Sequence, residues 1–274
     1  MRELWFIRNA SNRRSYHPTH KSTLTLTKNK MYQFKIKQAI EYPSEAFSDF
    51  ECVMTWELAT IVAESNSWKT TFALDMIEKN AERWVKWLYI NLEFPIETMW
   101  QSRWLRFNWK TKSDLTTIWK LTKDEIKDME NYINTKLSKF KSYSSPTWIS
   151  LPKLEQVIEV SAMEWYKFFV IDTFSRIHWN TTNDARWNQN KCMEELQELA
   201  QRLDVAIIVL HHTNRQGTWE GSQKIMDLSN VFIVISKEQD AEWEEYRHYA
   251  LLKDKYVVVK EVDVYYHWWK YDRF

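Results

Sequence analysis

The chain has 274 residues, of which 44% are hydrophobic and 27% are charged, and its formal net charge is +1. This length is enough to bury a sizeable core, and the composition excludes a disordered chain. No apolar run approaches the roughly 18–20 residues that span a bilayer, and the first residues do not have the pattern of a secretory signal. Two cysteines are too few for a disulfide framework. We therefore expect a cytoplasmic protein without membrane contact.

Residues 1–40 are strongly basic, with nine Lys or Arg and Glu3 as the single acid. A basic arm on an acidic body is typical of contact with nucleic acid, and it is equally typical of a solvated extension without a ligand. We interpret residues 1–44 as a basic N-terminal extension and residues 45–274 as the folded domain. Alternating residues in Met31–Ile40 favour a strand that leads into this domain.

From Glu57 onward, short apolar runs alternate with helical patterns. The runs that predict strands are Leu58–Ala63, Leu88–Leu92, Phe168–Ile171, Val205–Leu210 and Val231–Ile235, followed by the antiparallel candidates Tyr249–Leu252 and Tyr256–Tyr266. Several runs are almost uninterrupted, which is typical of strands buried on both faces of a parallel sheet. The pattern predicts an α/β fold with a mixed, mostly parallel central sheet flanked by helices.

Three helices can be predicted between these strands. Thr122 and Glu125 have the spacing of a capping box and precede apolar residues at helical intervals. Pro152 suits the first turn of a helix that runs through Ile158. A further apolar stripe from Cys192 to Leu203 indicates a helix packed on the core.

Tryptophan is unusually frequent and glycine unusually rare, with 17 Trp and 2 Gly. Together they come close to the about 7% that glycine alone occupies in average proteins. Asn108-Trp109-Lys110, His178-Trp179-Asn180 and Arg186-Trp187-Asn188 are typical of turns if their centre is glycine, and Trp268-Trp269 would be a Gly-Gly turn. We hypothesise that the gene uses UGA for glycine, as some bacterial lineages do, and that most of these tryptophans stand for glycine. The alternative is a truly Trp-rich protein.

One segment between a predicted strand and a helical pattern has the order of a phosphate-binding loop. With glycine at position 68 it becomes Ala-x-x-x-x-Gly-Lys-Thr, a P-loop that lacks only its first glycine. In such a loop main-chain N–H groups cradle phosphates, the Lys reaches the β and γ phosphates, and the Thr ligates Mg²⁺. The alternative is an ordinary strand–turn–helix. The expected nucleotide-binding residues are Ala63, Glu64, Ser65, Asn66, Ser67, Trp68, Lys69, Thr70 and Thr71.

Three later strands end in polar side chains. Glu93 follows an apolar run, and if that strand lies beside the P-loop strand, Glu93 emerges near the γ-phosphate and can deprotonate the attacking water. Asp172 closes a run with the pattern of a Walker B strand, whose acid holds Mg²⁺ mostly through water. Neighbours on a strand point to opposite faces, so we expect His211 and His212 to form no metal site and His212 to sense the γ-phosphate. The alternatives are a solvated Glu and a pair of hydrogen-bonded histidines.

Together these segments resemble the RecA-like ATPase core, most closely the C-terminal motor domain of DnaB-type hexameric helicases and their plasmid or phage relatives. The resemblance covers roughly residues 45–266. The segments that carry it are Thr55–Leu58, Ala63–Thr71, Asn91–Glu93, Val170–Asp172, Leu210–Arg215 and Gly221–Asp227.

This resemblance implies ATP and Mg²⁺ as cofactors. It implies that Lys69 and Thr70 bind nucleotide and metal, that Glu93 is the catalytic carboxylate and that Asp172 is the Walker B acid. His212 stands where the helicases usually carry Gln, and we include it with Glu93 and Lys69 in the catalytic set.

A second element of the resemblance lies near the end of the chain. Lys253 and Lys255 are similar to the Lys-x-Arg element that reaches into the nucleotide of a neighbouring subunit, with Lys255 at the Arg position. Lys lacks the planar fork of Arg, so this trans finger is expected to activate less strongly. The alternative is two solvated charges on a terminal strand.

We therefore expect an ATP-hydrolysing motor that acts on single-stranded DNA and forms a homo-oligomeric ring, a hexamer in the helicases it resembles. Arg215 and Lys224 lie in a polar region that can face a central channel, although such residues are more often plain surface charges. One alternative is a RecA/RadA-like recombination or repair ATPase. Another is a non-catalytic module whose Trp side chains stack on bases or sugars.

Overall fold

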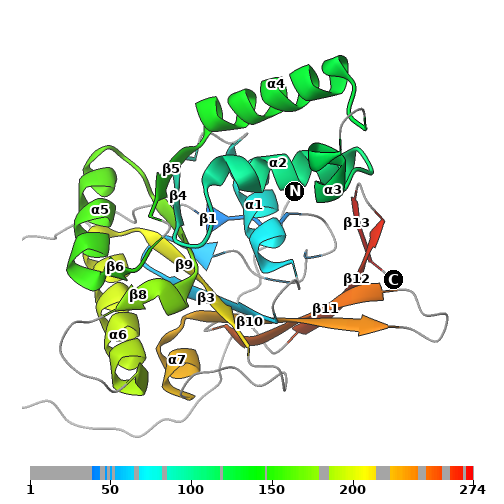
Figure 1. Cartoon of the computed structure of the whole chain (residues 1–274). Coiled ribbons are helices and arrows are strands. Elements are labelled where there is room, and N and C mark those ends of the chain that lie inside the picture. The colour runs from blue at the N-terminus through cyan, green and yellow to red at the C-terminus, as the bar shows by residue number, and fades with distance from the viewer. Residues whose placement is uncertain are drawn as a thin grey trace, which may run out of the picture. The chain divides into compact units, whose positions relative to one another are not determined.

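Parallel strands form the centre of the main sheet in the computed structural model. The structure describes residues 39–274 except 44–46, 48–49, 51–52, 65–67, 82–84, 118–119, 146, 179–184, 214–222, 240–244, 255–259, 268–269 and 274. Among these residues the sheet has nine strands in the order β13-β12-β11-β10-β3-β9-β7-β4-β5 (Figure 1). From β10 to β5 the neighbours are parallel, and from β10 to β13 they are antiparallel. Its strands are β3 (Leu58–Ala63), β4 (Trp87–Asn91), β5 (Lys141–Ser144), β7 (Phe168–Asp172), β9 (Ala206–His212), β10 (Val231–Gln239), β11 (Glu245–Asp254), β12 (Lys260–His267) and β13 (Lys270–Arg273).

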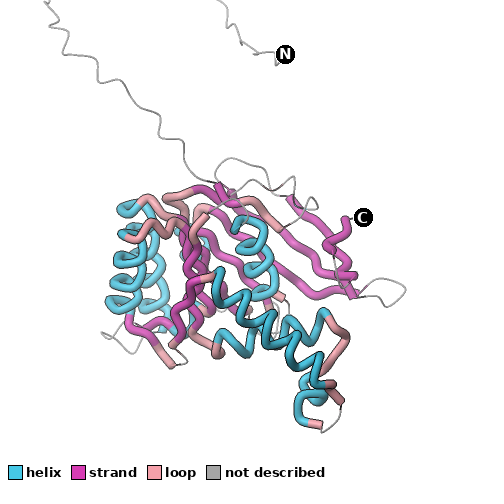
Figure 2. Tube along the Cα trace, turned by 90° about the horizontal axis from the view of Figure 1, so that it is seen from above, coloured by secondary structure: helices cyan, strands magenta, loops and turns pink. Residues whose placement is uncertain are grey.

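Helices cover both faces of this sheet (Figure 2). They are α1 (Lys69–Ala81), α2 (Ile96–Phe107), α3 (Lys112–Thr116), α4 (Lys123–Lys139), α5 (Leu151–Met163), the short 3₁₀ helix η2 (Phe174–Arg176), α6 (Ala185–Leu203) and α7 (Gln223–Leu228). Two small two-stranded sheets pair β1 (Ala39–Ile40) with β2 (Val53–Met54) and β6 (Ile149–Ser150) with β8 (Ile177–His178).

The alternation of side chains along the strands builds two separate cores. On one face Ala59 and Ile61 of β3 pack in the cluster that contains α1 and Trp100 of α2. On the other face Leu58 and Val62 pack in the cluster that contains α5, α6 and α7. Because both faces are covered, the parallel strands are apolar on both sides, which is the pattern seen in the sequence.

The predicted fold class is confirmed, and the five predicted core strands are found as β3, β4, β7, β9 and β10, with ends that shift by at most four residues. Helix α4 begins with the predicted capping box: Glu125 N–H donates to Thr122 Oγ1 at 3.1 Å and Thr122 N–H donates to Glu125 Oε2 at 2.8 Å. Pro152 lies in the first turn of α5, and Cys192, Leu196 and Leu199 of α6 are buried. Tyr249–Leu252 lies within β11.

One expectation is wrong, and one condition set out in the sequence analysis is not met. Arg186–Asn188 is not a turn, because α6 begins at Ala185 and includes these residues. Strand β4 is not the neighbour of β3, because β9 and β7 lie between them. Of the strand expected over Met31–Ile40, only β1 is described, and the predicted turn at Trp268-Trp269 lies outside the described residues.

The backbone adopts a positive φ at five described residues that are not glycine. They are Trp56 (76°), Trp68 (73°), Trp109 (56°), Trp165 (69°) and Asp204 (52°). Asp is one of the residue types enriched in this left-handed region, whereas a bulky residue there is an outlier. No helix in the described part of the chain is long and apolar enough to cross a membrane.

Candidate active site

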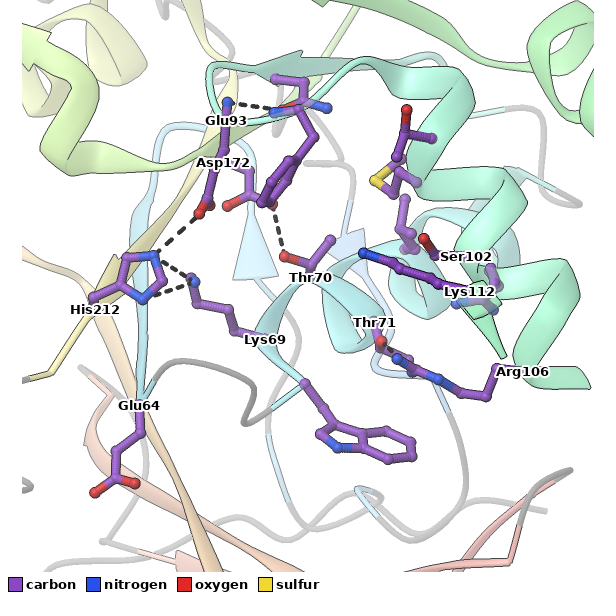
Figure 3. Close-up of a pocket in the computed structure, with 17 residues that line it drawn as sticks. Glu64, Lys69, Thr70, Thr71, Glu93, Ser102, Arg106, Lys112, Asp172 and His212 are labelled. Carbon is purple, nitrogen blue, oxygen red and sulfur yellow. Dashed lines mark hydrogen bonds and ion pairs between the residues drawn. The ribbon is translucent and has the colours of Figure 1, made fainter. Parts of the chain in front are cut away.

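The site lies where parallel strands β3, β9, β7 and β4 end at one edge of the sheet. Helix α1 begins there with Lys69, after the loop that follows β3. The other strand ends bring Glu93, Asp172 and His212 to the same place (Figure 3). These residues line a cavity of about 300 Å³ together with side chains from α2 and α3. Although two strands, β9 and β7, separate β4 from β3, Glu93 in the loop after β4 lines the same cavity as Lys69.

Lys69, His212 and Glu93 form a chain of polar contacts across the cavity. Lys69 Nζ lies 3.0 Å from Nε2 and 3.2 Å from Nδ1 of His212, and His212 Nε2 lies 3.7 Å from Glu93 Oε2. Burial lowers the pKa of Lys69, opposed by the charges of Asp172 and Glu93. The neighbouring His212 is the largest influence that holds the pKa of Glu93 below its usual value, opposed by burial and assisted by the charge of Lys69, so Glu93 is ionised at neutral pH.

Asn91 fixes the loop that carries Glu93. Its Oδ1 accepts hydrogen bonds from the main-chain N–H of Glu93 at 3.0 Å and of Phe94 at 3.1 Å. An Asn side chain that bonds to the backbone two residues later forms a turn of its own, so the chain bends directly after β4. Asn91 also lines the cavity, and the sequence analysis assigned it no role, although an Asn two residues before a strand-end Glu was an available signal.

Asp172 accepts two hydrogen bonds on one carboxylate oxygen. Thr70 Oγ1 donates to Asp172 Oδ2 at 2.7 Å, and the phenol of Tyr89 donates to the same atom at 2.6 Å. The other oxygen, Oδ1, is buried without a hydrogen-bond partner in the described structure. A buried carboxylate oxygen without a donor, beside a Thr hydroxyl, is the oxygen-rich setting that Mg²⁺ prefers, so these residues fit the metal.

Besides Lys69, the cationic side chains of Arg103, Arg106 and Lys112 line the cavity, and Arg247 lies beside it. Arg106 of α2 donates through Nη1 to Thr71 Oγ1 at 3.0 Å, and its guanidinium carbon lies 4.5 Å from the centre of the Trp68 ring. The guanidinium carbon of Arg247 lies 5.2 Å from the same ring. Lys112 lines the cavity from α3. The sequence analysis missed Arg106 and Lys112 because it predicted neither α2 nor α3.

The family model described as an AAA domain matches residues 51–218, which is more than half of the chain and includes every strand end of the site. The chain belongs to the AAA domain family. No curated protein sequence matches this AAA domain protein.

Solved structures show the same fold. One of them, the ATPase domain of another protein, superimposes with a TM-score of 0.66 at 14% identity, over 79% of this chain and 84% of that one. A DnaB-like replicative helicase, whose structure concerns its interactions with primase, gives 0.66 at 12% identity, over 77% of this chain and 55% of that one. A KaiC-like protein from Pyrococcus horikoshii OT3 gives 0.62 at 15% identity, over 87% and 99%. The AAA domain protein is therefore similar to RecA-like P-loop ATPases in fold.

The remaining predicted site residues are only partly described. Ala63 ends β3, and Glu64 lines the cavity. Lys253 Nζ donates to the main-chain carbonyls of Met226 at 2.9 Å and Asp227 at 2.5 Å, at the end of α7. Lys224 forms an ion pair with Glu194 of α6. Ser65, Asn66, Ser67, Arg215 and Lys255 lie outside the described residues.

Proposed function

We propose that this AAA domain protein hydrolyses ATP and uses the energy to act on single-stranded DNA. One observation carries the first part: Lys69, Thr70, Glu93, Asp172 and His212 come from separate parts of the sequence and line one cavity. This set supplies a cation for phosphates, oxygen atoms for Mg²⁺ and an ionised carboxylate for a water molecule.

In the proposed reaction, Lys69 leaves His212 and binds the β and γ phosphates. Thr70 and Asp172 would hold Mg²⁺, which supplies positive charge against the phosphate oxygens. Glu93 accepts a proton from the water whose oxygen bonds to the γ-phosphorus. The bond between that phosphorus and the bridging oxygen breaks, and ADP and phosphate leave.

His212 is suited to report which nucleotide is bound. In the described structure its ring contacts both Lys69 and Glu93. A γ-phosphate draws Lys69 away and gives the ring a new partner, whereas ADP leaves this position empty. The ring and the strand end that carries it therefore respond to hydrolysis.

The action on DNA is supported by the basic residues 1–40, by Arg215 and Lys224, and by the similarity in fold to a DnaB-like replicative helicase. We further propose a homo-oligomeric ring, in which Lys253 and Lys255 act on a neighbouring subunit's nucleotide. A forked DNA duplex with one labelled strand tests the proposed action on DNA. ATP-dependent unwinding supports the motor, whereas ATP-dependent strand exchange without unwinding favours the recombinase.

We also propose that glycine occupies positions 56, 68, 109 and 165 in the native protein, because UGA encodes glycine in this gene. Four of the five described non-glycine residues with positive φ are tryptophan. Trp165 has the conformation of a helix end that usually requires glycine. Its N–H donates to the carbonyl of Ala162 at 3.0 Å and the next N–H donates to Ser161 at 3.2 Å, which is the Schellman pattern with Trp165 at the C′ position.

Position 68 joins this proposal to the nucleotide site. Trp68 directly precedes Lys69, has a φ of 73° and lines the cavity with its indole. A glycine there adopts this φ without cost and lets the backbone approach a phosphate. By contrast, Trp104 is buried in α2 and donates its indole N–H to Asp128 at 2.8 Å, as expected of a true tryptophan.

Peptide mass spectrometry of the protein isolated from its natural host tests the proposal about glycine. We expect Gly at positions 68 and 165 and Trp at position 104. Trp at positions 68 and 165 in the natural protein, or UGG at those codons, would refute it.

A further inference from the structure

The phenol of Tyr89 lies in the core beneath the proposed magnesium site. Tyr89 sits in the middle of β4, is 2% exposed and belongs to the core cluster on the α1 face of the sheet. In the parallel pairing of β4 with β7, Tyr89 is opposite Val170 and Asn91 is opposite Asp172. Because side chains repeat with a period of two, Tyr89, Val170 and Asp172 share one face, and the long Tyr side chain reaches diagonally to the carboxylate.

The hydrogen bonds at Asp172 are distributed unevenly between its two oxygens. An ionised carboxylate only accepts, and both described donors, Tyr89 and Thr70, use Oδ2. Oδ1 is left buried without a donor in the described structure, and Asp172 as a whole is 4% exposed. A buried oxygen of this kind is unfavourable unless a ligand or water completes it.

Thr70 donates to the same carboxylate oxygen as Tyr89, and its own oxygen also faces the proposed metal site. Its hydroxyl has a single hydrogen, which it donates to Asp172, so only its lone pairs remain for Mg²⁺. The Tyr89 phenol has no other role at the site and sits on a strand in the core. The phenol commits its single hydroxyl hydrogen to Asp172 Oδ2 at 2.6 Å.

We propose that Tyr89 is a positioning residue that fixes the Asp172 carboxylate with Oδ1 directed to the magnesium ion of the bound nucleotide. This inference rests on the proposed ATP site. Tyr89 touches neither nucleotide nor metal and acts through Asp172. Residues that orient a metal-binding group from behind typically change metal affinity by about 10- to 100-fold when they are replaced.

The test compares Tyr89→Phe with the parent, which is the full chain with glycine at position 68. Tyr89→Phe removes the phenol oxygen and keeps the ring. The matched control is Tyr42→Phe, because Tyr42 is another buried tyrosine of the same core, packed against Phe47, Phe50 and Phe72. The affinity of a fluorescent, non-hydrolysable ATP analogue is measured with magnesium and with EDTA, and thermal unfolding is recorded for each protein.

In the parent and in Tyr42→Phe, magnesium strengthens binding of the analogue. In Tyr89→Phe we expect this gain to fall about tenfold, with affinity in EDTA unchanged and the loss recovered at high magnesium concentration. An unchanged gain in Tyr89→Phe, even with a lower melting temperature, overturns the positioning role and leaves the ATP site standing. Absence of binding by the parent under every condition instead overturns the proposed function and the role of Tyr89 with it.

Discussion

Replacing Trp165 by glycine should stabilise the protein, because Trp165 holds a left-handed backbone that only glycine adopts at no cost. A non-glycine residue in this region costs about 1–2 kcal/mol. Trp165 is 75% exposed, so removal of its indole sacrifices little buried apolar surface. We therefore expect the free energy of unfolding to rise by about 1 kcal/mol, which corresponds to about 2–4 °C in the melting temperature of a domain of this size.

Two control variants separate the backbone conformation from the loss of the indole. Trp165→Ala removes the indole and keeps the conformational cost, so its stability should stay near that of the parent. Trp104→Gly removes a side chain that is 3% exposed, together with its hydrogen bond to Asp128, and should cost about 4 kcal/mol or more. Urea and thermal unfolding followed by circular dichroism measure all three. If Trp165→Gly is no more stable than Trp165→Ala, the interpretation of this position as glycine is wrong.

Two further predictions concern pH and salt. His212 is the largest cause of the lowered pKa of Glu93. In the parent, kcat/KM for ATP should therefore hold until the pH falls below about 4.5, the ordinary Glu value. In His212→Asn the acid limb of the pH profile should move to higher pH, and an unmoved limb would contradict this coupling. Deleting residues 1–38 leaves β1 in place and removes nine Lys or Arg. The plot of the logarithm of the binding constant for single-stranded DNA against the logarithm of the salt concentration should then flatten in slope by up to about 6. An unchanged slope would mean that the basic N-terminal extension makes no phosphate contacts.

The sequence predicts the strand ends of the site well, because each is a local pattern. An apolar run closed by a polar residue identifies Glu93, Asp172 and the pair of histidines, and a strand followed by Lys-Thr-Thr identifies the start of α1. Parallel strands place such ends at one edge of a sheet, so their meeting could be expected without coordinates. The roles assigned to these residues remain predictions that the proposed experiments address.

The order of the strands and the far wall of the cavity could not be predicted in the same way. Strand pairing is a long-range property, and nothing within β4 indicates that β9 and β7 separate it from β3. Arg106 and Lys112 come from α2 and α3, which the sequence analysis did not predict, although Ile96, Trp100 and Trp104 of α2 recur at helical spacing. The five-residue α3 buries no residue and gives no such signal. Tyr89 lies hidden within an apolar run, although a phenol in a buried strand implies a hydrogen-bond partner and was the available signal.

ATP binding and hydrolysis by active-site variants test the central claim most directly. In the full chain with glycine at position 68, Lys69→Ala should abolish hydrolysis because the phosphates lose their cation. Glu93→Gln should keep ATP binding while single-turnover hydrolysis slows by about 10²–10⁴-fold, the scale for loss of a general base. Hydrolysis by Lys69→Ala at the parental rate, or a Glu93→Gln protein that loses binding but turns over bound ATP normally, would contradict the assignment of this cavity as an ATPase site.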